Sequence, residues 1–167
     1  MVQDQVKKSR QEMRQMLLYN LWQKIQSKAG SDPFLIAAQQ NISISLHLDD
    51  ERRCGEQKRI GEFRPDAMTI EIFVEPLKIF WRELFPGCSL SLKYRYVCWR
   101  ELWNYWVMHR FAPISGLLQK AWPIYLKEFS RVTSVEQQYL SHYFACLATG
   151  VLEQEPKTER SLNSIFD

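Results

Sequence analysis

The sequence predicts an α+β domain that is predominantly helical, with a small antiparallel sheet packed on the helices. Several long segments place apolar residues at the spacing of an amphipathic helix, and two short segments alternate apolar with polar residues as half-buried strands do. Glycine is scarce, at 6 of 167 residues, which argues against a fold of many strands and turns. The chain is long enough for one domain with its own core. We therefore predict a single domain over residues 1–153 and a polar tail over residues 154–167.

The first half of the chain contains a long predicted helix and the predicted strands. Residues 3–28 carry apolar side chains at helical spacing, and Gly30 suits the position just after the helix. Apolar and polar residues alternate over residues 41–48 and again over residues 68–74, and residues 59–63 form a third candidate strand. The inward-facing positions of the first strand are predicted to be Ile42, Ile44, Leu46 and Leu48.

The second half of the chain is predicted to be helical throughout. Helices are expected over residues 76–84, about 91–111, 114–129 and 134–152. Pro123 interrupts the third of these segments. Thr133 or Ser134 caps the last one, and Glu136 is well placed to complete a capping box.

The composition limits the classes of function and the cellular location. The formal net charge is +3, which by itself does not indicate a nucleic-acid-binding protein. The 6 Trp and 7 Tyr indicate either a bulky core or an aromatic surface for a partner. The four cysteines form no C-x-x-C pair and no secretory signal precedes them, so we expect reduced thiols and a cytoplasmic protein. No apolar run approaches the roughly 20 residues of a membrane span, so no membrane partner is expected.

The predicted long helix contains the segment from Val97 to Trp106, in which Glu101 follows Arg100 and precedes Asn104 by three residues. A zinc-peptidase helix reads H-E-x-x-H, in which two histidines on one face ligate the metal and the glutamate activates a water molecule. Here the glutamate position is kept as Glu101, and the two ligand positions hold Arg100 and Asn104.

The surroundings of this segment resemble one family, the small zinc metallopeptidases similar to phage-repressor-cleaving proteins. Gly61-Glu62-Phe63 and Ile70-Glu71-Ile72 resemble the strand segments that accompany the metal-binding helix in that family. A later helix of the family supplies a glutamate ligand in the pattern E-x-x-A-N-x-F-A, and Gln138 stands at the position of that glutamate. The resemblance covers roughly residues 59–147 and depends on the order of elements more than on identities.

What the resemblance implies is a zincin-like scaffold that has lost its metal ligands. An arginine has no lone pair to offer a metal, and an amide oxygen is a poor donor for Zn²⁺. Arg100, Asn104 and Gln138 should therefore not hold zinc in the way of the family, and no cofactor is expected. We expect a non-catalytic binding or regulatory protein whose partner is another protein.

Two other functions and a purely structural interpretation stay open on the sequence. A metal-dependent hydrolase would use Glu101 as a general base, with His109 or His142 as a ligand or partner. A nucleic-acid-binding module would use basic residues that interleave with aromatic ones. These residues are Lys93, Arg95, Arg100 and Arg110 among Tyr94, Tyr96, Trp99, Trp103 and Trp106. In the structural interpretation Asn104 hydrogen-bonds the Glu101 carboxylate, Arg100 need not pair with it, and the three residues form a polar cluster.

The space between the helices at 91–111 and 134–152 is the candidate site. A concave pocket with Glu101 pointing into it would favour a function, whereas a filled, dry contact would favour simple packing. The candidate pocket residues are Arg100, Glu101, Asn104, His109, Gln138 and His142.

Overall fold

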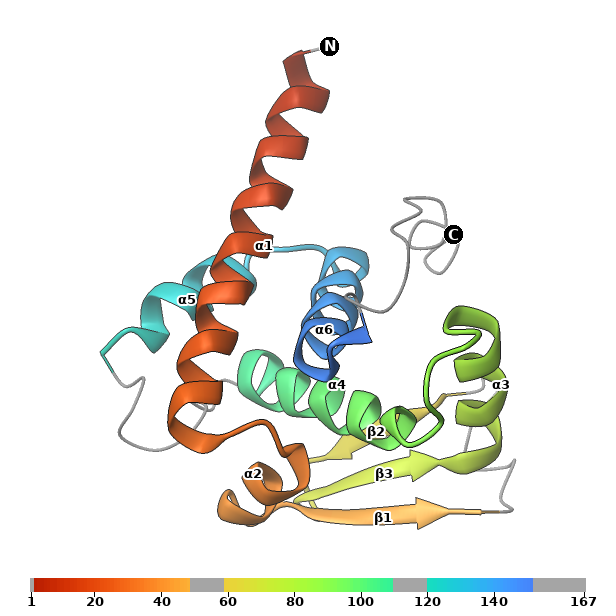
Figure 1. The fold of residues 1–167 in the computed structure, drawn as a ribbon. Coiled ribbons are helices and arrows are strands. Elements are labelled where there is room, and N and C mark those ends of the chain that lie inside the picture. Colours follow the sequence, from red (N-terminus) through yellow and green to blue (C-terminus); the bar gives the residue numbers. More distant parts are fainter. Residues whose placement is uncertain (1, 49–58, 110–119, 152–167) are drawn as a thin grey trace.

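The structure is a computed structural model that describes residues 2–48, 59–109 and 120–151 (Figure 1). Its elements are α1 (Val2–Ala29), α2 (Pro33–Gln39), β1 (Ser43–His47), β2 (Gly61–Arg64), β3 (Thr69–Phe73), α3 (Val74–Leu84), α4 (Leu92–Met108), α5 (Trp122–Phe129) and α6 (Ser134–Thr149). The predicted α+β class is confirmed, because helices dominate and pack against one three-stranded sheet. The predicted tail at residues 154–167 lies outside the described residues.

The sheet is mixed, so the predicted antiparallel sheet is wrong for one of its two strand pairs. Its order is β1-β3-β2, with β1 parallel to β3 and β2 antiparallel to β3. A parallel pair needs a long connection, and the stretch between His47 and Thr69, which includes β2, provides one. Alternation of apolar residues indicates which face of a strand is buried, but it carries no information on strand direction.

The predicted inward face of β1 is correct for its first half and wrong for its second. Ile42 is buried and Ile44 is half-buried, whereas Leu46 is 53% exposed and Leu48 is 60% exposed. Since β1 is an edge strand and α2 packs against it near its start (Figure 1), the apolar alternation continues past the part of the strand that a helix covers.

The ends of the helices agree with most of the capping predictions. Thr133 accepts a hydrogen bond from the Glu136 backbone, and the Glu136 side chain accepts one from the Thr133 backbone, which completes the capping box of α6. Gly30, directly after α1, has a φ of +80°, as expected for a helix-ending glycine. Pro123 lies in the first turn of α5, so it begins this helix and does not interrupt one. Residues 110–119 lie outside the described residues.

The core is built around α4, which packs against α6, α2, α3 and the strands β2 and β3. All six tryptophans are at most 5% exposed, namely Trp22, Trp81, Trp99, Trp103, Trp106 and Trp122. The tryptophans therefore belong to the core and provide no aromatic surface for a partner, whereas Tyr19 is 50% exposed. Figure 1 shows the N-terminal half of α1 projecting beyond this core, and the buried residues of α1 all lie in its C-terminal half. Within the described residues, no helix combines the length and apolar content of a membrane span.

Candidate functional site

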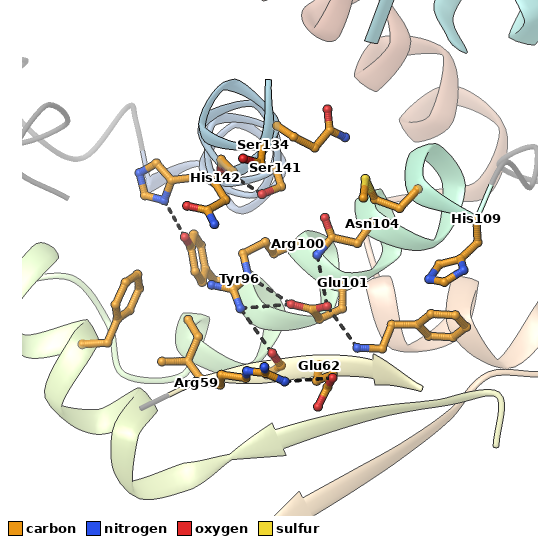
Figure 2. A pocket seen from close by; sticks show the side chains of 17 residues that line it. Arg59, Glu62, Tyr96, Arg100, Glu101, Asn104, His109, Ser134, Ser141 and His142 are labelled. Carbon is orange, nitrogen blue, oxygen red and sulfur yellow. Dashed lines mark hydrogen bonds and ion pairs between the residues drawn. The ribbon is translucent and has the colours of Figure 1, made fainter. Parts of the chain in front are cut away.

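A cavity of about 660 Å³ lies between β2, α4 and α6 (Figure 2). Its lining residues include all six that the sequence singled out, which are Arg100, Glu101, Asn104, His109, Gln138 and His142. The facing helices therefore leave a concave space between them, and the alternative of a filled, dry contact does not describe this part of the molecule.

Glu101 is a buried carboxylate, 3% exposed, whose two oxygens both accept hydrogen bonds. Its Oε2 accepts from the backbone N–H of Phe63 at 3.1 Å and from Nδ2 of Asn104 at 3.2 Å. Its Oε1 accepts from Nε and Nη2 of Arg100 at 3.1 and 3.0 Å. The structure thus contains the predicted hydrogen bond between Asn104 and Glu101. The carboxylate also accepts from Arg100 and from the Phe63 backbone, so donors surround both of its oxygens.

Arg100 pairs with Glu101, a contact that the sequence left open because neighbours on a helix need not meet. The long side chain turns so that its guanidinium lies beside the adjacent carboxylate, and Nη2 also donates to the carbonyl oxygen of Gly61 at 3.4 Å (Figure 2). Burial lowers the pKa of Arg100, but the negative charge of Glu101 and the hydrogen bonds outweigh burial and leave the pKa above its ordinary value. The site therefore contains a permanent cation.

The Arg100–Glu101 pair closes the outer edge of the sheet. Gly61 and Phe63 lie on β2, an edge strand, and they direct a carbonyl oxygen and an N–H at side chains of α4. This satisfies backbone groups that no further strand pairs with. The polar cluster that the sequence suggested is thus a buried link between α4 and β2, not a solvated face.

The close approach of α4 and β2 depends on a glycine. A Cβ atom at position 61 would lie 2.4 Å from Cγ1 of Val97 and 3.2 Å from the carbonyl oxygen of Glu71. Only a residue without a side chain lets the helix come near enough for Glu101 to reach the strand backbone.

His142 borders the cavity from α6 and is held in a neutral state. Its Nδ1 shares a hydrogen bond with the hydroxyl of Tyr96, and its Nε2 lies 3.6 Å from Sγ of Cys146. Burial and the positive charge of Arg100 lower the pKa of His142 to about 4. At neutral pH this ring is therefore an uncharged hydrogen-bonding group.

His109 lies at the end of α4, where its ring packs against the ring of Phe63 with centroids 5.2 Å apart. In the described parts of the chain, no group of three His, Cys, Asp or Glu side chains is arranged to hold a metal ion. Glu101, His109 and His142 share the cavity wall without converging on one point, so the geometry gives no support to a metal-dependent hydrolase with these ligands.

The residues at the family's ligand positions also do not fit zinc. Arg100, at the first of these positions, has no lone pair to donate to a metal ion. Its guanidinium also pairs with Glu101, the carboxylate that would act as the base. A Zn²⁺ ion beside it would face a fixed positive charge at short range. Asn104 and Gln138 offer amide oxygens, which are weak donors for this metal.

Gln137 is a cavity residue that the sequence reasoning missed. It is 9% exposed, and neither Nε2 nor Oε1 has a hydrogen-bond partner. It shares one face of α6 with other polar residues of the cavity, which are Ser134, Gln138, Ser141 and His142. This helical spacing of polar residues was visible in the sequence and could have indicated the wall of a site.

The aromatic residues cited for nucleic-acid binding are mostly in the core. Tyr96, Trp99, Trp103 and Trp106 are each at most 1% exposed, so they cannot stack on bases. Lys93 is itself 8% exposed, and Arg110 lies outside the described residues.

Comparisons with known protein families, curated proteins and solved structures gave no match for this chain. The resemblance to small zinc metallopeptidases therefore remains a prediction from the motif residues and the order of elements.

Proposed function

We propose that this protein is a non-catalytic binding protein on a degenerate metallopeptidase-like scaffold, with a segment of another protein as its partner. The observation that carries the proposal is the Arg100–Glu101 ion pair in the cavity wall, at a distance of 3.0 Å. It supports binding without hydrolysis because a guanidinium occupies the first ligand position of the motif and pairs with the glutamate of the motif.

The hydrogen bonds of Glu101 argue against a role as general base. A general base must present a free oxygen to the water or substrate whose proton it removes. Both oxygens of Glu101 already accept from Arg100, Asn104 and the Phe63 backbone. Arg100 also stands where a metal ligand would be and cannot hold a Lewis-acidic ion. Metal-assisted hydrolysis therefore lacks both its metal and its general base at this site.

The cavity has the features of a site for an uncharged ligand. Among the lining residues that the structure describes, two are arginines and each is compensated by a carboxylate, because Arg59 pairs with Glu62 and Arg100 pairs with Glu101, both at 3.0 Å. Aromatic rings and neutral polar side chains make up much of the remaining wall. Such a mixture of apolar surface and a few polar groups is typical of binding pockets.

Metal analysis of the purified protein tests this function. After incubation with zinc and removal of free metal, we expect substoichiometric zinc and no hydrolysis of a fluorogenic casein substrate. Stoichiometric zinc that is lost on the substitution His142→Ala would contradict the proposal.

A second variant tests the scaffold separately. The triple substitution Arg100→His, Asn104→His and Gln138→Glu restores the donor set of the family, so we expect it to gain one zinc ion per chain. The single substitution Arg100→His is the matched control and should bind zinc weakly. A folded triple variant without zinc would reject the metallopeptidase-like scaffold and leave the non-catalytic function in place.

A further inference from the structure

The two edges of the sheet differ in how the rest of the chain protects them. The outer edge of β2 is closed, because Arg100 donates to the carbonyl oxygen of Gly61 and Glu101 accepts from the N–H of Phe63. The opposite edge belongs to β1 (Figure 1), and among the described residues no strand pairs with it. Proteins usually protect such an edge with charged residues or proline. β1 contains no Lys, Arg, Asp, Glu or Pro, so its edge is open to pairing with another strand.

The backbone groups on this open edge belong to Ile44 and Leu46. The N–H of Ser43 donates to the carbonyl oxygen of Met68 at 2.9 Å, so the backbone groups of Ser43 face β3. Because the hydrogen-bonding direction alternates along a strand, Ser45 also faces β3, whereas Ile44 and Leu46 direct their N–H and C=O away from it. Two residues of β1 therefore each present a donor and an acceptor to whatever lies beside the edge.

The same two residues have apolar side chains on the face of the sheet that packs against the helices. Ile44 and Leu46 stand opposite Ile70 and Ile72 of β3, which are both fully buried. Leu46 is nevertheless 53% exposed, because the cover that α2 gives to β1 lies near the start of the strand (Figure 1). The second half of β1 thus has an apolar side chain on the core face that no described helix covers well.

A second copy of the strand provides what this edge lacks. If two β1 strands pair antiparallel about a twofold axis at Ser45, Ile44 of each copy faces Leu46 of the other. Since these residues direct their backbone groups outward, each such pair exchanges two N–H to C=O hydrogen bonds. The same rotation brings the start of the partner's β1, with α2 beside it, to the end of β1, where Leu46 lacks a cover. With no acidic residue, Lys or Arg on β1, no pair of like charges from these side chains opposes the contact.

We infer that the open edge of β1 is the interface of a symmetric dimer, in which two β1 strands pair antiparallel about Ser45 and join the two sheets into one. This surface is separate from the cavity, and the inference does not depend on the proposed function. A strand of five residues is only about 17 Å long. The contact is therefore smaller than the roughly 1,200–2,000 Å² of stable complexes, and the dimer dissociates on dilution.

A disulfide at the twofold axis tests the register of the two strands. In this pairing the two Ser45 residues lie directly opposite each other as a non-hydrogen-bonded pair, with Cα atoms about 4.5 Å apart, which a disulfide can bridge. The two Ser43 residues are separated by about 13 Å along the strands. Under mild oxidation, the full chain with Ser45→Cys should cross-link on the order of tenfold faster than its matched control, Ser43→Cys. The parent protein, oxidised in parallel, measures cross-links through its own four cysteines.

Sedimentation velocity of the full chain tests the surface without added cysteines. The parent should change from monomer to dimer as its concentration rises through the micromolar range. Leu46→Lys should raise the dissociation constant about tenfold, because the symmetric interface loses two apolar cross-strand pairs. Ile124→Lys adds the same charge at a 72% exposed residue of α5 and should leave the dissociation constant unchanged. Both variants should keep the melting temperature of the dilute parent, since both side chains are exposed in the monomer.

Three results would overturn the inference. A monomer at every concentration would mean that no second copy occupies the edge. Cross-linking of Ser43→Cys as fast as that of Ser45→Cys would exclude the register about Ser45. A dimer that Leu46→Lys does not weaken would place the interface on another surface, such as the projecting half of α1. None of these results bears on zinc content or hydrolysis, which test the proposed function separately.

Discussion

The substitution Gly61→Ala tests whether the close contact between α4 and β2 is as tight as the structure indicates. The new Cβ would lie 2.4 Å from Cγ1 of Val97, about 1 Å inside the normal separation of two carbon atoms. Val97 is fully buried and β-branched on a helix, so it has little freedom to rotate away. The carbonyl oxygen of Glu71, at 3.2 Å, blocks the opposite movement.

The expected loss of stability follows from two opposing effects. Overpacking of this kind costs about 3 kcal/mol, the upper end of its usual range, because the contact is close on two sides. Alanine also restricts the unfolded chain, which stabilises the protein by about 0.4–1 kcal/mol. We therefore expect a net destabilisation of about 2 kcal/mol, or a fall of about 4–8 °C in melting temperature.

A double-mutant cycle measured by urea unfolding checks the origin of this loss. Val97→Ala removes the clashing methyl group, so Gly61→Ala should cost at least 1 kcal/mol less in that background. Val107→Ala, a buried valine further along α4, is the control background and should leave the cost unchanged. A cost below about 0.5 kcal/mol, or one that Val97→Ala does not reduce, would refute the contact.

Two further predictions concern the charges of the site. The pKa of His142 falls from 6.5 in the unfolded chain to about 4 in the folded protein. The neutral ring therefore adds about 3 kcal/mol to the free energy of unfolding above pH 6.5, and this stability is lost as the pH falls from 6.5 to 4. Urea unfolding across this range should show the loss, and the variant His142→Gln should lack this part of it; an unchanged pH profile would contradict the burial of a neutral ring. Glu101→Gln leaves the partly buried Arg100 without its counter-charge and should cost about 3 kcal/mol, whereas Glu62→Gln at a more exposed pair should cost less than about 1 kcal/mol. Similar losses for the two variants would argue against a buried link.

Local sequence patterns predicted the helices better than the sheet. A capping box is a contact between residues three apart, so Thr133 and Glu136 determine the start of α6 without help from the rest of the fold. Strand direction and edge position depend on distant residues. The alternation that buries Ile42 therefore also led to the wrong prediction for Leu46, which extends beyond its covering helix.

The sequence predicted where the candidate site lies, but it predicted only some of the hydrogen bonds within the site. Helical spacing brought Glu101 and Asn104 to one face, and the structure confirms their hydrogen bond. The sequence could not show that Arg100 bends back to Glu101, because that contact depends on the nearby carbonyl oxygen of Gly61 on β2. The polar spacing on α6 could have pointed to Gln137, but the burial of its amide without a partner can be recognised only once its surroundings are known.

The burial of all six tryptophans has a spectroscopic consequence. Four of the indole rings, Trp22, Trp99, Trp103 and Trp106, lie with Phe144 in one cluster of neighbouring aromatic rings. Their emission should lie at short wavelength and resist quenching by iodide, since none of them meets solvent to any large extent. Intrinsic fluorescence therefore reports on the integrity of the whole interior at once, and binding in the cavity is better followed through labels placed elsewhere.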